Sequence, residues 1–538
     1  MSSTGPAQAL DPPGALAAPG EGAPGAGQLP SQAAWLLLLA TFVIATCGLI
    51  YELVAGAMAS YLLGDSVTQF SLVIGTYLSA MGLGSWLSRW VGGDLLARFL
   101  RIEIAVGLLG GTSSVVLFAA HAFLGVARPA LFLEVGLIGT LVGLEIPLLM
   151  RILRDQVAFA ELVARVLAWD YLGALAASLL FPLVMVPLLG LPRTAFLFGL
   201  VNAGLALLLT FPLAGALGRR ARWVRIEAAL ATAFLAVGLV QAERVAAWAE
   251  QHIYDAAVLL RERTRYQTIV VTAARSDLRL HLDGHLQFSS KDEYRYHEAL
   301  VHPAAAAVSG PLRTALVLGG GDGMALRELL RYESLQRATL VDLDPAMTRL
   351  FADEPMLRAL NGGSLRHPKV TVINADALAW LEEYAGDPFD LVVIDLPDPR
   401  NHAIGKLYTR DFYRLVRRNV AELGAVVVQS TSPWAAPRAF WCVELTLRDA
   451  GYTTWPYHCW VPSFGDWGYV LALPAARPRP ARLKEGLGGL RFLSDAGLAG
   501  LFDFPPDQRP PEGIRVNRLH EQVLVHYHEE DWRAGGGE

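Results

Sequence analysis

The sequence is poor in charged residues and in cysteine. Asp, Glu, Lys and Arg make up 18% of its 538 residues, whereas hydrophobic residues make up 53%, and the mean hydropathy is +0.36. This composition excludes an ordinary soluble protein. The net charge of −5 gives no sign of a basic surface, so we expect no nucleic-acid partner. The spacing of Cys47, Cys442 and Cys459 suits neither a zinc site nor a disulfide framework, so we expect three core thiols and no metal site.

The first 32 residues lack Lys and Arg and are rich in Ala, Gly and Pro. Without a basic n-region this segment is not a signal peptide, and we expect residues 1–32 to form a disordered tail. Long apolar runs then fill residues 33–244 and predict an α-helical membrane domain with six or seven transmembrane helices. The expected spans lie near residues 34–62, 67–88, 102–125, 130–150, 166–190, 194–215 and 225–242, of which the last is short and flanked by charges.

Arginines cluster in alternate loops between these spans. Three follow the second span, three the fourth and three the sixth: Arg89, Arg98, Arg101, Arg151, Arg154, Arg165, Arg219, Arg220 and Arg222. The intervening loops hold only Arg128 and Arg193. The positive-inside rule places the arginine-rich loops and the N-terminus in the cytoplasm. If residues 225–242 cross the membrane, the C-terminal half lies outside; if they do not, it stays inside.

The pattern changes to α/β after about residue 250. Residues 266–272 and 278–282 read as a β-hairpin, which predicts a small β-subdomain. Apolar strands are then expected at 314–318, 338–342, 370–374, 390–394 and 424–429, separated by helical patterns, with a further helix and a hairpin in 434–474. This order predicts a doubly wound, Rossmann-like domain over 250–475, with ligands at the carboxyl ends of its strands. Residues 476–538 are expected to be a C-terminal tail.

A glycine-rich turn at residues 319–323 follows the first of these strands. Glycines allow a tight turn and a close approach of the backbone to a ligand. The third glycine of a dinucleotide-binding motif is missing, because Met324 and Leu326 hold the candidate positions. A methyltransferase-like nucleoside site is therefore favoured over a dehydrogenase site.

Acidic residues end successive strands of this domain. They are Asp322, Asp342, Asp344, Asp376, Asp395 and Asp398. Each alone is as readily a turn former or a helix cap, but in register they should meet at one edge of the sheet. Asp342 lies about 20 residues after the turn, where a ribose-binding carboxylate is expected. Carboxylates in one cleft repel each other and favour a cationic ligand, such as a sulfonium or a polyamine.

These residues resemble the spermidine synthases, the polyamine aminopropyltransferases, in a membrane-fused bacterial subgroup. The matching stretches follow the family's order and are residues 266–267, 282–287, 292–298, 319–323, 341–344, 375–377, 395–399 and 407–413. The resemblance implies transfer of an aminopropyl group from decarboxylated S-adenosylmethionine to an amine. The expected acceptor is putrescine, with spermidine and methylthioadenosine as products and no tightly bound cofactor.

The resemblance also implies a role for each matching residue. Asp395 would be the catalytic base. The donor would be bound by Gln267, Gln287, His297, Gly321, Asp322, Asp342, Asp376 and Ala377. The acceptor would be bound by Tyr296, Asp398, Phe464 and Asp466. Phe464 stands where the family commonly has a tyrosine, and Asp466 is expected to replace that hydroxyl in part.

Two other functions stay open at this stage. One is an S-adenosylmethionine-dependent amine methyltransferase, and the other is a non-catalytic polyamine sensor or transporter. Glu52, Glu145 and Asp170 lie in or beside apolar spans, where they would form a cation pathway or simply interhelical hydrogen bonds. We expect a multi-pass protein of the cell membrane whose partners are a small polyamine and lipid, with self-association implied by the soluble relatives. A cytoplasmic catalytic domain is favoured, because the donor is made there.

Overall fold

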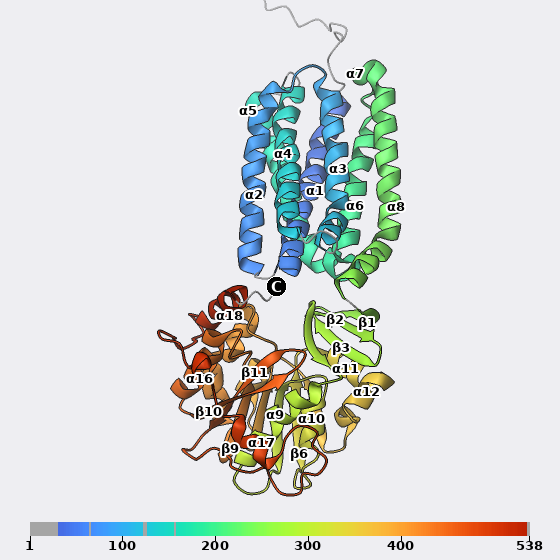
Figure 1. Cartoon of the computed structure of the whole chain (residues 1–538). Helices are drawn as coiled ribbons and strands as arrows, with labels where there is room; N and C mark the ends of the chain where they lie inside the picture. The colour runs from blue at the N-terminus through green and yellow to red at the C-terminus, as the bar shows by residue number, and fades with distance from the viewer. Residues whose placement is uncertain (1–30, 64–65, 122–125, 155–157, 255, 535–538) are drawn as a thin grey trace, which may run out of the picture.

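The computed structural model describes residues 31–63, 66–121, 126–154, 158–254 and 256–534. Most of the tail predicted at residues 1–32 lies outside these ranges. The chain forms a bundle of long helices and, below it, an α/β domain (Figure 1). This division agrees with the change of sequence pattern near residue 250.

The bundle contains seven long helices in the described part of the chain. They are α1 (Ser31–Leu63), α2 (Ser66–Leu87), α3 (Leu95–Ala119), α4 (Ala127–Leu153), α5 (Phe159–Leu180), α6 (Val186–Leu209) and α8 (Ala221–Ile253), with the short α7 (Ala214–Leu217) before the last. Six segments are long and apolar enough to cross a membrane, and one of them, Phe159–Leu209, contains both α5 and α6. Within it the chain breaks at Gly190, whose φ of 72° favours glycine. The uncertain span 225–242 is the middle of α8, which runs the length of the bundle (Figure 1).

The three arginine-rich loops lie together at one end of the bundle. Arg220 pairs with Asp94 (Nη1–Oδ2, 2.6 Å), which joins the start of α8 to the start of α3. Arg151 Nη1 donates to Ser88 O (2.7 Å), which joins the end of α4 to the end of α2. The opposite end faces the α/β domain, where a side chain at Gly190 would come within 2.9 Å of Arg263 Nη1. The arginine-rich loops and the α/β domain are thus at opposite ends of the bundle.

The α/β domain is built on a seven-stranded sheet of order β10-β11-β9-β8-β5-β6-β7. Its strands are β5 (Thr314–Gly319), β6 (Arg337–Asp342), β7 (Val370–Asn374), β8 (Phe389–Asp395), β9 (Val420–Gln429), β10 (Thr453–Val461) and β11 (Gly465–Leu473). The first five are parallel, and the last two form the antiparallel hairpin at one edge. Helices cover both faces: α9 (Glu293–Ala307), α10 (Met324–Leu329), α11 (Pro345–Asp353), α12 (Pro355–Leu360), α13 (Ala377–Glu383), α14 (His402–Gly405), α15 (Arg410–Arg418) and α16 (Pro437–Asp449). All five predicted parallel strands are confirmed, and so are the helix and the hairpin predicted in residues 434–474, which are α16 and β10–β11.

Two regions hold more structure than the sequence predicts. The small sheet has four strands, not two, in the order β1 (Ala257–Arg263), β2 (Thr268–Ala274), β3 (Asp277–Leu282) and β4 (His285–Ser289). The described part of the tail packs onto the α/β domain and contains α17 (Asp495–Gly500) and α18 (Val523–Ala534). Glu298 holds it by accepting hydrogen bonds from the backbone N–H groups of Arg491, Phe492 and Leu493 (2.8–2.9 Å). The three cysteines are free and buried.

Candidate active site

The glycine-rich turn after β5 brings the backbone against two carboxylates. A β-carbon at Gly320, where φ is 62°, would lie 3.1 Å from Asp395 Oδ2. One at Gly321 would lie 2.6 Å from Asp342 Oδ2. Since β5 is flanked by β6 and β8, the carboxyl ends of these strands meet over the glycines. Side chains at these two positions would crowd the carboxylates, so the backbone of the turn lies directly against them, at the point where the sequence predicted a ligand.

Asp395 ends β8 and receives a hydrogen bond from Tyr296 of α9 (Oη to Oδ1, 2.6 Å). Burial raises the pKa of Asp395 to about 6; the charge of Asp322 acts in the same direction, while the charge of His297 and the Tyr296 hydrogen bond oppose it. Burial is also the main cause of the raised pKa values of Asp322 and of Asp342, the latter to about 6. A positive charge beside these carboxyl groups would favour the ionised form of all three.

A cationic histidine stands behind these carboxylates. His297 is 2% exposed, and its Nδ1 lies 2.9 Å from Glu293 Oε2, one turn earlier on α9. Burial alone would lower the pKa of His297, but the hydrogen bond to Glu293 and the charge of that carboxylate outweigh it and raise the pKa to about 9. Arg327 in turn donates two hydrogen bonds to Glu293 (3.0 and 2.9 Å). Arg327 thus holds Glu293, and Glu293 stabilises the protonated His297 near Asp322 and Asp395.

Two further polar residues, Asp344 and Gln267, lie near Asp342 at the end of β6. Asp344 caps α11 and accepts hydrogen bonds from Gln267 Nε2 (3.1 Å) and Thr264 Oγ1 (2.8 Å). The predicted residue Gln267 is thereby placed beside the ribose-binding candidate Asp342, whose Oδ1 accepts from the backbone N–H of Asp344 (2.9 Å). Predicted Gln287, by contrast, donates within its own strand to His285 O (3.2 Å).

Asp376 caps α13 at the end of β7, just before the buried Ala377. Its Oδ1 accepts from Leu378 N (2.9 Å) and its Oδ2 pairs with Lys406 Nζ (2.8 Å). Burial would raise the pKa of Asp376, but the hydrogen bond and charge of Lys406, with the backbone N–H groups of Leu378 and Ala379, together outweigh it and lower the pKa. The structure therefore gives this carboxylate a capping role in addition to any contact with a ligand.

Asp398 is buried, and the C-terminal helix α18 contacts it. His528 of α18 contacts its Oδ2 through Nε2 (3.3 Å), and Thr431 Oγ1 donates to the same oxygen (3.3 Å). Burial would raise the pKa of Asp398, but the hydrogen bond and charge of His528, with the charge of Arg400 and the hydrogen bond from Gln429, together outweigh it and lower the pKa. Gln429 Nε2 and Tyr408 Oη hold the preceding loop through Leu396 O.

The two residues predicted from the late loop, one just before β11 and one at its start, contact different parts of the domain. Phe464 packs against Tyr296 (ring centroids 6.2 Å apart) and Trp467 (5.0 Å), on the side of the carboxylates. Asp466 is paired with His458 (Oδ1–Nδ1, 2.7 Å) and accepts from Gln508 (Oδ2–Nε2, 2.9 Å). Successive side chains of a strand alternate between faces, so Asp466 and Trp467 point to opposite faces of β11. Both carboxylate oxygens of Asp466 are paired with residues other than the strand-end carboxylates.

Sequence reasoning missed four residues of this site. Glu293 carried a usable signal, because its spacing of four from His297 places both on one face of a helix. Arg327, Lys406 and His528 carried none, since each reaches the site from a distant part of the chain.

The sheet order and the strand-end carboxylates define an α/β domain of the methyltransferase-like type. Residues 293–480 match the family of the spermine/spermidine synthase domain. Polyamine aminopropyltransferase 2 of Ralstonia nicotianae is 51% identical over 509 residues, which cover 93% of this chain and 98% of that protein. A polyamine aminopropyltransferase of Leptospira interrogans is 47% identical over 500 residues, covering 92% and 98%. The crystal structure of spermidine synthase from Thermotoga maritima covers 46% of this chain and 85% of its own, with 21% identity and a TM-score of 0.41.

The chain belongs to the polyamine aminopropyltransferase family. Because the two relatives match it over nearly their whole length, the similarity includes the helical bundle as well as the α/β domain.

Proposed function

We propose that the protein transfers the aminopropyl group of decarboxylated S-adenosylmethionine to putrescine, yielding spermidine and methylthioadenosine. One observation carries the proposal: Asp322, Asp342 and Asp395 surround a glycine turn with their pKa values raised, and each would be stabilised in its ionised form by a cation. The donor is a sulfonium and the acceptor is an ammonium. The negative charge of these carboxylates disfavours ordinary S-adenosylmethionine, whose own carboxylate would add a further negative charge. A methyltransferase is therefore the weaker alternative.

The reaction needs one bond made and one broken. The acceptor nitrogen attacks the carbon next to the sulfonium, the carbon–sulfur bond breaks, and its electron pair returns to sulfur as the thioether of methylthioadenosine. The attacking amine has an ordinary pKa near that of Lys, about 10.4, and must first lose a proton. Asp395 is the proposed base for that proton, and the hydrogen bond from Tyr296 orients its carboxyl group. Holding both reactants in one cleft supplies much of the remaining acceleration.

On the donor side, the proposed contacts are Asp342 with the ribose, Asp376 and Ala377 with the adenine edge, and Gln267 beside them. Gly321 allows the backbone to approach the nucleoside, and Gln287 remains the proposed neighbour of the thioether. His297 and Tyr296 would position the aminopropyl arm. On the acceptor side, Asp398 is the proposed anchor for the distal ammonium and Phe464 an apolar wall along the chain.

We also infer that the bundle spans a lipid membrane as a multi-pass domain. Its outer surface is apolar: Leu133, Leu188 and Val240 are 66%, 74% and 76% exposed. With seven crossings, the α/β domain lies on the side opposite the arginine-rich loops. The positive-inside rule then places this domain outside the cytoplasm. This conflicts with the expectation of a cytoplasmic catalytic domain, which rested on where the donor is made and not on the residues of this chain.

The test is release of methylthioadenosine by the purified full chain in detergent, given the decarboxylated donor and a panel of amines. We expect release with putrescine and none when ordinary S-adenosylmethionine replaces the donor. Asp395→Asn should lower turnover by a factor on the order of 10² to 10⁴ while donor binding, measured by calorimetry, is spared. Asp387→Asn, at an exposed position, is the matched control and should be silent. Methyl transfer from the ordinary donor, or turnover of Asp395→Asn at the normal rate, would overturn the assignment.

A further inference from the structure

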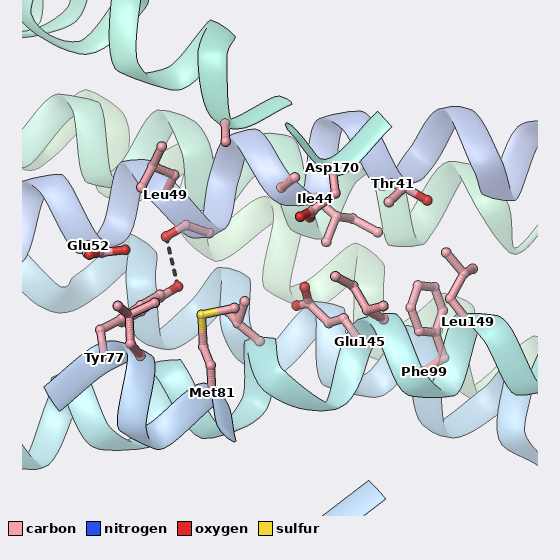
Figure 2. A pocket seen from close by; sticks show the side chains of 16 residues that line it. Thr41, Ile44, Leu49, Glu52, Tyr77, Met81, Phe99, Glu145, Leu149 and Asp170 are labelled. Carbon is pink, nitrogen blue, oxygen red and sulfur yellow. Dashed lines mark hydrogen bonds between the residues drawn. The ribbon is translucent and has the colours of Figure 1, made fainter. Parts of the chain in front are cut away.

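A cavity inside the helical bundle is lined by three carboxylates. It has a volume of about 190 Å³ and lies between α1, α2, α4 and α5. Glu52 comes from α1, Glu145 from α4 and Asp170 from α5. Figure 2 shows Glu145 and Asp170 facing each other across one part of the cavity, with Glu52 further along it. Helices far apart in the sequence thus bring together the ionisable residues that stood out in the apolar spans.

These carboxylates have no cationic partner in the cavity. Glu145 is 5% exposed, and its Oε1 has no hydrogen-bond partner among the described residues. Glu52 is 9% exposed. None of the 16 lining residues, all in the described part of the chain, is Lys, Arg or His. A buried, ionised carboxylate without a partner is strongly unfavourable, so this arrangement favours a positively charged ligand.

The remaining walls indicate what kind of cation fits. Ile44, Leu49, Met81, Phe99 and Leu149 line the cavity between and around the carboxylates. No three His, Cys, Asp or Glu side chains among the described residues are grouped to hold a metal ion, and a hard cation such as Ca²⁺ takes about six to eight oxygen ligands. An apolar surface with separated carboxylates suits an organic cation with an aliphatic body.

The positions of the carboxylates along the bundle set the length of the ligand. Gly48 of α1 lies against Val142 of α4, where an added β-carbon would be 3.3 Å from Val142 Cγ1. From that level Glu145 lies three residues toward one end of the bundle and Glu52 four residues toward the other, because the two helices are antiparallel (Figure 1). At 1.5 Å per residue, the two carboxylates are about 10 Å apart along the axis. The cavity therefore offers two anionic positions with an apolar stretch between them.

We propose that this cavity binds an aliphatic di- or polyamine, with one ammonium group between Glu145 and Asp170 and another at Glu52. The site is separate from the carboxylates at the strand ends, which belong to the α/β domain, so it gives the bundle a ligand of its own. The acceptor or product of the proposed reaction has this chemistry, and binding here would let the bundle sense or pass that amine.

The test counts amine sites on the full chain. The protein is reconstituted in lipid nanodiscs, and binding of radiolabelled spermidine is measured at equilibrium. We expect two classes of site in the parent protein. Glu145→Gln should remove one class, or weaken it at least about tenfold, and Glu52→Gln should do the same. Release of methylthioadenosine at saturating substrate should be unchanged, because neither residue belongs to the α/β domain.

Glu134→Gln is the matched control, since it makes the same change on the same helix at a residue that does not line the cavity. It should keep both classes. If Glu145→Gln fails to fold, as judged by gel filtration, Asp170→Asn tests the same end of the site. Butylamine, with one ammonium group, should compete much more weakly than putrescine. Parent-like binding by Glu145→Gln and Glu52→Gln, equal loss in Glu134→Gln, or equal competition by the monoamine would overturn the proposal.

Discussion

At the scale of single residues, the site depends on how burial changes the acidity of its carboxyl groups. Asp322, Asp342 and Asp395 could be listed from the sequence because each follows a strand. Their raised pKa values could not, because these depend on burial and on one another's charge. The imidazolium of His297 is a similar case in part, since the Glu293 carboxylate that stabilises it is held by Arg327 from another helix, α10.

The state of Asp395 predicts the pH dependence of turnover. A base must be ionised, so kcat/KM should fall as the pH drops through about 6, the pKa that burial gives Asp395. Tyr296→Phe removes the 2.6 Å hydrogen bond that lowers this pKa, so the acid limb should move to higher pH. A pH profile of methylthioadenosine release measures both. Tyr332→Phe, which removes a buried hydroxyl bonded to His302 (2.8 Å), should leave the limb in place; an unmoved limb in Tyr296→Phe would contradict the assignment.

At the scale of elements, the C-terminal helix is part of the catalytic domain and not a loose tail. Helix α16 begins without a capping side chain of its own. Asp531 of α18 supplies the cap, since its Oδ2 accepts from the backbone N–H groups of Arg438 (2.8 Å) and Ala439 (3.2 Å). The same helix delivers His528 to Asp398. The composition of residues 476–538 predicted neither contact, because both join residues about 90 to 130 positions apart.

Asp531→Ala should therefore lower the stability of the α/β domain by about 1 kcal/mol or somewhat more, the usual cost of losing an N-terminal cap. Urea unfolding of the detergent-solubilised chain, followed by tryptophan fluorescence, measures the change. Glu530→Ala is the control: it removes an exposed ion pair with the same Arg438, and such pairs contribute little. Equal effects of the two substitutions would show that Asp531 acts as one more surface charge and not as a cap.

At the scale of the whole molecule, the direction of α8 decides at which end of the bundle the α/β domain lies, and with it the side of the membrane on which we propose the reaction takes place. The arginine-rich loops meet at the end of the bundle far from the α/β domain. We predict that alkaline phosphatase fused to the C-terminus is active in bacterial cells and that green fluorescent protein fused there is dark, since each reports one side of the membrane. The same reporters at the N-terminus should give the opposite pair of results. A fluorescent C-terminal fusion would place the catalytic domain inside and show that the arginine rule fails for this bundle.

The sequence by itself determined the division into an apolar bundle and an α/β domain, the five parallel strands, and the carboxylates at their ends. These follow from local patterns: runs of apolar residues, alternation of strand and helix, and glycines where the backbone must turn. The tertiary structure alone decided that α8 runs the length of the bundle, that Asp466 pairs with His458, and that α18 reaches Asp398. It also gathered Glu52, Glu145 and Asp170 around one cavity. Each of these depends on packing between segments distant in the chain, which no local pattern records.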